Sequence, residues 1–307
     1  MSKLISVIMA AYNSMDCIYD AIESVLRQDY GDVELIICDD ASVSFDADEI
    51  KAYIEKNKGA GLRAYDVYSN EQNLGTVKNL NTAIARSHGE IITEIGSDDM
   101  FCNDRVLSDI ASSMECSGAE FMIMGRAAFC DTVDDIIETL PTTEDRKKIM
   151  AIETPAELRT PIFSGTVLNI ASGCAWAYTR ALFEDMGGYD EAYLLLEDSP
   201  FIAKYLASGQ MPYRNYELIS VYYRLGGVST GKISPKMKVD MLRLLQTGLD
   251  DASITGFDKR MIRHHMYCMV NDVNENRRKK WISRVMFPDV SAYNLSVQLR
   301  RRLHGDK

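Results

Sequence analysis

The sequence predicts an α/β fold in which a mostly parallel sheet is flanked by helices and followed by a helical C-terminal region. Along the first 125 residues, short apolar runs rich in β-branched residues alternate with amphipathic stretches at helical spacing. Beyond Ser234, glycine and proline become rare and the pattern is helical down to a basic end. Strands that alternate with helices favour parallel pairing, with helices on both faces of the sheet.

The first part of the chain carries the clearer elements. Leu4 to Ala10 is an apolar run typical of a buried strand, and the apolar positions between Ile18 and Leu26 recur at helical spacing. Further strands are predicted over 33–38, 63–68, 90–95 and 121–124, and further helices over 76–87 and from about 104. Polar residues follow several of these strands directly, at the edge of a parallel sheet where ligands bind.

The second part is less regular. Residues 131–169 contain Pro141, Pro155 and Pro161, and we interpret them as a long loop region with room for short helices. Strands are then predicted over 175–178 and 218–223, with helices from 180 and over 199–207. Trp176 lies on one of these strands, where stacking on a bound ligand and packing in the core are equally open. His88, at the end of a helix, is assigned a capping role.

Composition excludes several classes of protein. Of 307 residues, 46% are hydrophobic and 26% are charged, which is typical of a globular chain and not of a disordered one. The seven cysteines are odd in number and include no C-x-x-C pair, so reduced thiols are expected rather than a disulfide framework or a zinc site. The apolar run at the start is too short to span a bilayer and has no secretory n-region. We therefore expect a cytoplasmic protein.

Charge is unevenly distributed along the chain. The net charge is −11, yet residues 277–307 hold nine Lys or Arg and two acidic residues. An acidic body argues against nucleic-acid binding. The basic clusters lie beside Trp281, Val285 and Phe287, which suits an interfacial helix on the anionic inner face of a membrane. A solvated helical face or a contact with another subunit explains the same pattern equally well.

Two pairs of carboxylates follow predicted strands. Asp98-Asp99 comes directly after the strand over 90–95, and a hard divalent cation would relieve the repulsion between the two side chains. An acidic cap of the next helix is the alternative explanation. Asp39-Asp40 has the same ambiguity, because Asp-Asp-Ala-Ser is also ordinary turn chemistry.

The order of the short motifs is more specific than any one of them. The chain reads Ala-Ala-Tyr-Asn after the first strand, Asp-Asp-Ala-Ser after the second, then Asn73-Leu74-Gly75, and then Gly-Ser-Asp-Asp. This order resembles the nucleotide-binding half of the inverting glycosyltransferase family 2, which has the GT-A fold. The resemblance is strong over residues 3–125 and weaker to about 230, through Met186-Gly187-Gly188-Tyr189-Asp190 and Leu196-Glu197-Asp198.

The resemblance implies roles for residues along the strand ends. Ala10 and Tyr12 would line the base pocket, with Asn13 also binding the nucleotide-sugar. Asp40 would accept a hydrogen bond from uracil N3–H, with Asp39 supporting the same loop. The resemblance places further contacts to the nucleotide-sugar at four positions: Asn73, Gly75, Lys78 and Asp98.

The resemblance also implies a catalytic arrangement. Asp99 would be the direct ligand of Mn²⁺ or Mg²⁺, which offsets the charge of the departing diphosphate. Asp198 would be the general base that deprotonates the acceptor hydroxyl, oriented by Glu197. The alternative for Glu197-Asp198 is an acidic first helical turn favoured by the helix dipole.

These inferences combine into one expectation. The chain is expected to be an inverting, metal-dependent glycosyltransferase that moves a single sugar from a nucleotide-diphospho-sugar, with UDP favoured, to a glycan or lipid-linked acceptor. Residues 1–232 would form the catalytic domain, with donor binding in 1–125 and the acceptor side in 126–232, and residues 233–307 a helical region with the basic tail. A non-catalytic nucleotide-sugar-binding or membrane-docking module, and a sugar nucleotidyltransferase, are the alternatives.

Overall fold

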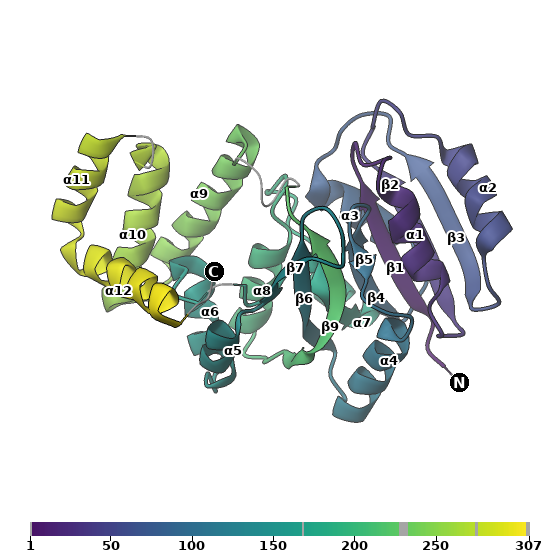
Figure 1. The fold of residues 1–307 in the computed structure, drawn as a ribbon. Coiled ribbons are helices and arrows are strands. Elements are labelled where there is room, and N and C mark those ends of the chain that lie inside the picture. Colours follow the sequence, from purple (N-terminus) through teal and green to yellow (C-terminus); the bar gives the residue numbers. More distant parts are fainter. Residues whose placement is uncertain (1, 168, 227–232, 274–275, 305–307) are drawn as a thin grey trace.

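A computed structural model describes residues 2–167, 169–226, 233–273 and 276–304, without the side chains from residue 300 on (Figure 1). Its described part contains one mixed sheet with the strand order β3-β2-β1-β4-β8-β6-β9-β5, and β7 pairs with β6 outside this path. The strands are β1 (Ile5–Ala11), β2 (Val33–Asp39), β3 (Leu62–Ser69), β4 (Ile91–Gly96), β5 (Met100–Phe101), β6 (Phe121–Phe129), β7 (Ile136–Leu140), β8 (Trp176–Thr179) and β9 (Tyr213–Arg224).

Helices cover both faces of this sheet and continue beyond it, so the predicted fold class is confirmed. The α-helices of the first part are α1 (Ile18–Leu26), α2 (Ala47–Asn57), α3 (Thr76–Arg86), α4 (Val106–Ser117), α5 (Thr143–Met150), α6 (Pro155–Ser164), α7 (Arg180–Asp185) and α8 (Asp198–Ala207). A short 3₁₀ turn, η1 (Gly173–Ala175), precedes β8. The C-terminal helices are α9 (Pro235–Asp250), α10 (Gly256–Val270), α11 (Arg277–Met286) and α12 (Pro288–His304).

Strand β1 is the centre of the parallel half of the sheet, between β2 and β4. Its side chains alternate between two layers, as strand geometry requires. Val7 and Met9 pack with α1 and α2, whereas Ile8 packs with α3. Burial on both faces explains why this strand reads as a continuous apolar run rather than an alternating one.

The second half of the sheet departs from parallel pairing. Strand β8 is antiparallel to both β4 and β6, and β5 and β7 form antiparallel pairs with β9 and β6. Strands β6 and β9 are parallel, with two shifts of register around Gly125. These long strands bring residues 121–129 and 213–224 beside the parallel half, and so extend the edge at which its strands end.

Three helices lie where the sequence predicted none or left the structure open. In α2, only Ile50 and Ile54 are buried, so its apolar stripe was too narrow to be recognised. Helices α5 and α6 occupy the region interpreted as a loop because of its prolines. Pro155 stands in the first turn of α6, where a missing N–H costs nothing, and Thr154 caps that turn.

The C-terminal helices share the core of the sheet domain. Leu244 and Leu245 of α9 and Ile262 of α10 belong to the same apolar cluster as Trp176 of β8. A Cβ atom added to Gly248 would lie 2.7 Å from the ring of Phe163, so α9 packs closely on α6. The predicted domain boundary falls at residues 227–232, which lie outside the described residues, and it stays a prediction. None of the described helices has both the length and the apolar content needed to cross a bilayer.

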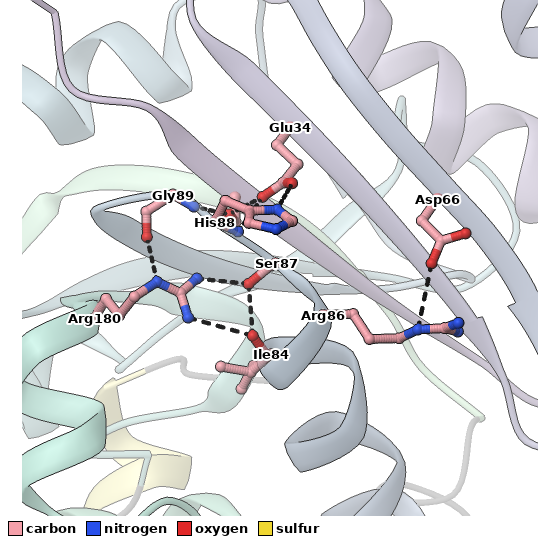
Figure 2. A network of polar contacts seen from close by, with 9 residues as sticks. Glu34, Asp66, Ile84, Arg86, Ser87, His88, Gly89 and Arg180 are labelled. Carbon is pink, nitrogen blue, oxygen red and sulfur yellow. Dashed lines mark hydrogen bonds and ion pairs between the residues drawn. The ribbon is translucent and has the colours of Figure 1, made fainter.

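A network of polar contacts connects the amino ends of the central strands, opposite the carboxyl ends that border the site (Figure 2). The buried Glu34 accepts hydrogen bonds from Ser6 Oγ at 2.6 Å, from His88 N at 2.7 Å and from His88 Nδ1 at 2.8 Å. Burial opposes ionisation of Glu34, but these hydrogen bonds hold its pKa below the ordinary value. Arg180 donates to Gly89 O and to Ser87 Oγ beside the end of α3. The expected capping role of His88 is not what the structure shows: Ser87 is the C-cap of α3, and His88, one residue later, bonds to Glu34 instead.

Candidate functional site

The carboxyl ends of the central strands meet at one edge of the sheet. Ala11 pairs with Asp39, and Ala10 pairs with Gly96. Main-chain bonds join the loops that follow, since Asp40 N donates to Ala11 O at 2.9 Å and Ser97 N donates to Ala10 O at 3.0 Å. The structure thus brings together three of the polar motifs that the sequence placed at strand ends.

The loop after β1 exposes an aromatic side chain. Tyr12 has 49% of its surface exposed, whereas Ala10 is half-buried against the core. Asn13 has a φ of +53°, a left-handed conformation that asparagine tolerates, and its N–H donates to Ser42 Oγ at 2.7 Å. The turn at Asn13 therefore also anchors this loop to the one that follows β2.

Asp39 is fully buried, and its carboxylate is engaged by its own neighbourhood. It accepts hydrogen bonds from Ser42 N at 2.8 Å, from Ser42 Oγ and from Ser69 Oγ at 2.6 Å. These bonds fix the loop after β2 to the end of β3. Asp39 therefore stabilises this loop, and its role beside a nucleotide stays a prediction.

Asp40 organises the loop that leads into α3. Its Oδ1 accepts from Leu74 N at 2.7 Å and from Asn70 Nδ2 at 3.2 Å, and its Oδ2 accepts from Gly75 N at 2.9 Å. Asn73 Nδ2 donates to Asp40 O at 3.3 Å. A carboxylate has about four lone-pair positions, so about one remains at Asp40 Oδ2. Asn73 and Lys78 are exposed at the rim of this loop.

Gly75 lets a second, distant segment approach the same loop. Its φ is +85°, and an added Cβ would lie 2.5 Å from Leu194 Cδ1 and 2.6 Å from Leu194 O. Val77 N also donates to Leu194 O at 3.2 Å. Only glycine meets both requirements at this position. The segment before Glu197-Asp198 is therefore held against the loop that Asp40 organises.

The Asp98-Asp99 pair lies directly after β4. Asp99 is 3% exposed and accepts from Arg224 N at 2.9 Å, while Arg224 Nε donates to Asp98 O at 3.1 Å. Burial raises the pKa of both carboxyls, and the neighbouring Asp98 charge raises the pKa of Asp99 further. A Cβ at Gly96 would lie 2.7 Å from Asp98 Oδ1, which explains the glycine. Arg224 and Arg126 compensate this charge only in part, so the pair has the oxygen ligands and the excess negative charge that suit a divalent cation.

Glu197 and Asp198 stand at the start of α8. Asp198 Oδ1 accepts from Ser199 N at 2.5 Å and from Ser199 Oγ at 3.1 Å. Burial raises the pKa of both carboxyls, and the charge of Asp198 raises that of Glu197 further. The positive charge of Arg126 opposes this effect at Asp198 and also at Asp99. Arg126 is itself buried on β6, so its guanidinium lies within electrostatic reach of both acidic pairs.

Glu94 is a further buried carboxyl beside this pair, and the sequence reasoning missed it. Its Oε1 accepts from Tyr178 OH at 2.5 Å and from Tyr189 OH. A Cβ built on Gly173 would lie 3.6 Å from Glu94 Oε2 and 3.0 Å from Glu197 Oε1, so the two carboxyls flank one point. Burial raises the pKa of Glu94 to about 7. An acidic residue inside an otherwise apolar strand was the signal that could have revealed it.

Trp176 does not line the site. It is fully buried and packs beside the Tyr189 ring, with ring centroids 6.3 Å apart and nearly parallel planes. Of the two explanations left open for this residue, core packing is therefore the correct one.

Similarity to known proteins agrees with this geometry. Residues 6–187 match the model of glycosyl transferase family 2. The chain belongs to glycosyl transferase family 2. It is 33% identical over 108 residues to the E. coli protein named UDP-Glc:alpha-D-GlcNAc-diphosphoundecaprenol beta-1,3-glucosyltransferase WfaP, a stretch that covers 35% of this chain and 40% of that protein.

Another relative of this family 2 chain is the putative teichuronic acid biosynthesis glycosyltransferase TuaG of Bacillus subtilis, 34% identical over 116 residues, or 38% of this chain and 44% of TuaG. The matching stretches span 40 to 54% of the length of the first curated relatives.

Two solved structures show the same fold. S. aureus TarS 1-349 in complex with UDP-GlcNAc has a TM-score of 0.59 at 19% identity, covering 97% of this chain and 77% of that one. Mannosyltransferase PcManGT from Pyrobaculum calidifontis, in complex with GDP-Man and Mn²⁺, has a TM-score of 0.60 at 15% identity, covering 97% and 81%. Both extend the likeness through the C-terminal helices.

The raised pKa of Glu94 predicts a stability that depends on pH. The unfolded chain releases this proton near the ordinary pKa of 4.5, but the folded chain keeps it until about pH 7. Glu94 therefore makes folding progressively less favourable as pH rises between these values, by on the order of 3 kcal/mol. Glu94→Gln stays uncharged and can still accept from both tyrosines. Its melting temperature minus that of the wild type should increase between about pH 5 and about pH 8.

Exposed Glu90, just before the same strand, supplies the matched control. Glu90→Gln should shift the melting temperature by an amount that hardly changes with pH. A difference for Glu94→Gln that is equally flat across this range would contradict the buried, protonated state assigned to Glu94.

Proposed function

We propose that this chain is an inverting glycosyltransferase that moves one sugar from a UDP-sugar to a hydroxyl of a glycan or lipid-linked acceptor, as in cell-surface polysaccharide biosynthesis. The observation that carries the proposal is that two acidic pairs, Asp98-Asp99 and Glu197-Asp198, lie within electrostatic reach of the same arginine, Arg126, in a chain that belongs to family 2. The printed names of WfaP and TuaG, and the UDP-GlcNAc complex of TarS, support the donor and acceptor classes.

The donor's nucleotide would lie on the loops after β1, β2 and β3. Tyr12 is exposed enough to stack on a base, with Ala10 and Asn13 shaping the turn beside it. The lone pair left on Asp40 Oδ2 is the acceptor that uracil N3–H needs, while Asp39 keeps the loop in place. Asn73 and Lys78 lie exposed where a diphosphate would pass, with Gly75 buried behind them, and the Lys78 charge suits that anion.

The leaving group requires compensation for the charge that builds on the diphosphate. Asp99, with Asp98 toward the ribose or sugar, would hold Mn²⁺ or Mg²⁺, which supplies that compensation. Within the described residues, no group of three or more His, Cys, Asp and Glu side chains is placed to hold a metal ion. The remaining oxygen ligands would therefore come from the diphosphate and water. The Mn²⁺ in the PcManGT complex supports this choice of ion.

The acceptor hydroxyl must lose a proton as it attacks the anomeric carbon from the face opposite the diphosphate. Asp198 would accept that proton, and Glu197 would orient it. Burial raises the pKa of Asp198 and so strengthens it as a base, while the Arg126 charge favours its ionised form. Attack on one face and departure on the other invert the anomeric configuration.

Helix α11 suggests how a lipid-linked acceptor could be reached. Trp281 and Val285, one turn apart, are 66% and 59% exposed, and Arg277, Arg278 and Arg284 are exposed on the same short helix. We propose that this face rests on an anionic bilayer at the inner face of the cytoplasmic membrane, because its charge is complementary to the lipid and its apolar side chains can enter the interface. The side chains of Arg300, Arg301 and Arg302, which belong to the predicted basic tail, lie outside the described residues.

The first prediction of the proposed function concerns the cation. Asp99→Asn preserves the shape of the side chain and its bond from Arg224 N, but removes the charge. Calorimetry should show that Mn²⁺ no longer tightens the binding of a UDP-sugar, with an unchanged or higher melting temperature because a buried charge is gone. Asp104→Asn, an exposed carboxylate nearby, is the control. Donor affinity that still depends on Mn²⁺ in Asp99→Asn would move the metal elsewhere.

The second prediction concerns the base. Asp198→Asn should retain UDP-sugar binding but lose catalysis by roughly 10²-fold or more, the usual scale for general base catalysis. Release of UDP by hydrolysis, in which water replaces the acceptor, can be measured across a panel of UDP-sugars with Mn²⁺. Exposed Glu184→Gln should behave as wild type. Wild-type protein that binds a UDP-sugar but never releases UDP would instead identify a binding module.

The third prediction concerns α11. Deleting the tail would uncover Met261, which packs with Phe287 and Val290, so substitution of exposed residues is the cleaner test. Each basic residue near an anionic bilayer contributes about 1 kcal/mol, so Arg277→Gln with Arg278→Gln should weaken binding to phosphatidylserine vesicles roughly 30-fold at low salt. Lys3→Gln with Lys56→Gln removes the same charge from exposed residues at the start of the chain and on α2, at the end of the molecule opposite α11, and should have little effect. Wild-type protein that ignores such vesicles at low salt would refute docking.

A further inference from the structure

The chain between Tyr189 and Asp198, called here the 189–198 segment, has no helix or strand before α8 yet is held at several points. Asn81 of α3 fixes its start, because Tyr189 N donates to Asn81 Oδ1 and Asn81 Nδ2 donates to Tyr189 O, both at 2.9 Å. The Tyr189 hydroxyl also donates to Glu94 of β4. The start of the segment is therefore anchored to the sheet domain.

The middle of the segment is held by a C-terminal helix. Asp240 of α9 is 3% exposed, and its Oδ2 accepts hydrogen bonds from both Leu194 N at 2.9 Å and Leu195 N at 2.6 Å. One turn along the same helix, the guanidinium of Arg243 lies 5.6 Å from the centre of the Tyr193 ring. One face of α9 thus contacts three consecutive residues of the segment.

The same residues also touch the donor side. Leu194 O accepts from Val77 N at 3.2 Å, and the Leu194 side chain fills the space left by the missing Cβ of Gly75. Gly75 N in turn donates to Asp40. Leu194 therefore lies between the loop that Asp40 organises and the helix that carries Asp240, and Asp198 follows four residues later.

We propose that Asp240 is a positioning residue, which holds the 189–198 segment so that Glu197 and Asp198 keep their place opposite the donor loop. This inference rests on the proposed function. It makes α9 part of the catalytic unit, although α9 lies in the helical region 233–307 that the sequence placed outside the catalytic domain. Asp240 acts through main-chain amides and not by touching substrate.

Amide hydrogen exchange tests the contact without any substrate. Asp240→Ala removes the acceptor of two part-buried N–H groups, so exchange at Leu194 and Leu195 should accelerate at least roughly tenfold relative to wild type. Asp240→Asn keeps an oxygen that can accept both bonds and should retain most of the protection. Asp250→Ala, an exposed aspartate on the same helix, should leave these amides unchanged. Unaltered protection in Asp240→Ala would overturn the contact.

Kinetics test the positioning itself. UDP release from a UDP-sugar with Mn²⁺, well below the melting temperature, should show a kcat lowered roughly tenfold or more in Asp240→Ala, with little change in KM. Asp240→Asn should recover most of this loss, and Asp250→Ala should equal wild type. A purely structural role would lower the melting temperature but leave kcat unchanged, and that result would refute positioning.

The proposed function and the positioning role of Asp240 can be refuted separately. If the wild type releases no UDP from any donor, the proposed function is wrong and the catalytic part of this inference falls with it. If the wild type is active and Asp240→Ala has faster exchange but normal kcat, the proposed function stands and only the role of Asp240 is refuted. If Asp240→Ala does not fold, a normal kcat together with lost protection in Asp240→Asn refutes it equally.

Discussion

Burial of negative charge at one edge of the sheet is the constraint on which the rest of the structure depends. Carboxylates that leave water must be compensated by hydrogen bonds, by positive charge or by protonation. Asp39, Asp40 and Asp240 are compensated by N–H and O–H donors of the protein itself. These three therefore act as anchors, and each one fixes a loop that borders the site.

A second set of buried carboxyls is compensated only in part. The pKa of Asp99 and of Glu197 is raised well above its ordinary value, by burial first and by a neighbouring carboxylate second. Arg126 is the charge that opposes this at Asp99 and Asp198, and it serves both sides of the proposed reaction centre. Groups held in this state gain most from an external partner, such as a cation at Asp99 or an acceptor hydroxyl at Asp198. The sequence alone could not show which buried carboxyls are fully hydrogen-bonded within the protein and which, like Asp99 and Asp198, are compensated only in part.

The elements with local signals were predictable, and those with distant partners were not. Strand β1 and helix α3 were recognised because apolar periodicity needs no tertiary information. The polar strand ends were predictable because parallel strands finish at a common edge. Asp240 could not be recognised, since its role depends on Leu194 and Leu195, which are 46 and 45 residues away in the sequence. Arg126 was overlooked for the same reason.

The C-terminal helices connect the surface proposed to meet a membrane with the segment that leads to Asp198. Figure 1 shows α10, α11 and α12 at the end of the molecule opposite α2 and β3, with α9 between them and the sheet. Helix α9 contacts the 189–198 segment through Asp240, and it shares apolar core with α6 and α10. In the described part of the chain, α11 packs on α10, α10 packs on α9, and α9 contacts the segment that leads to Asp198, so a lipid surface under α11, as proposed, would be connected to Asp198 through these helices. Docking and catalysis would then be linked by rigid contacts rather than by a flexible tether, because closely packed side chains transmit displacement instead of absorbing it.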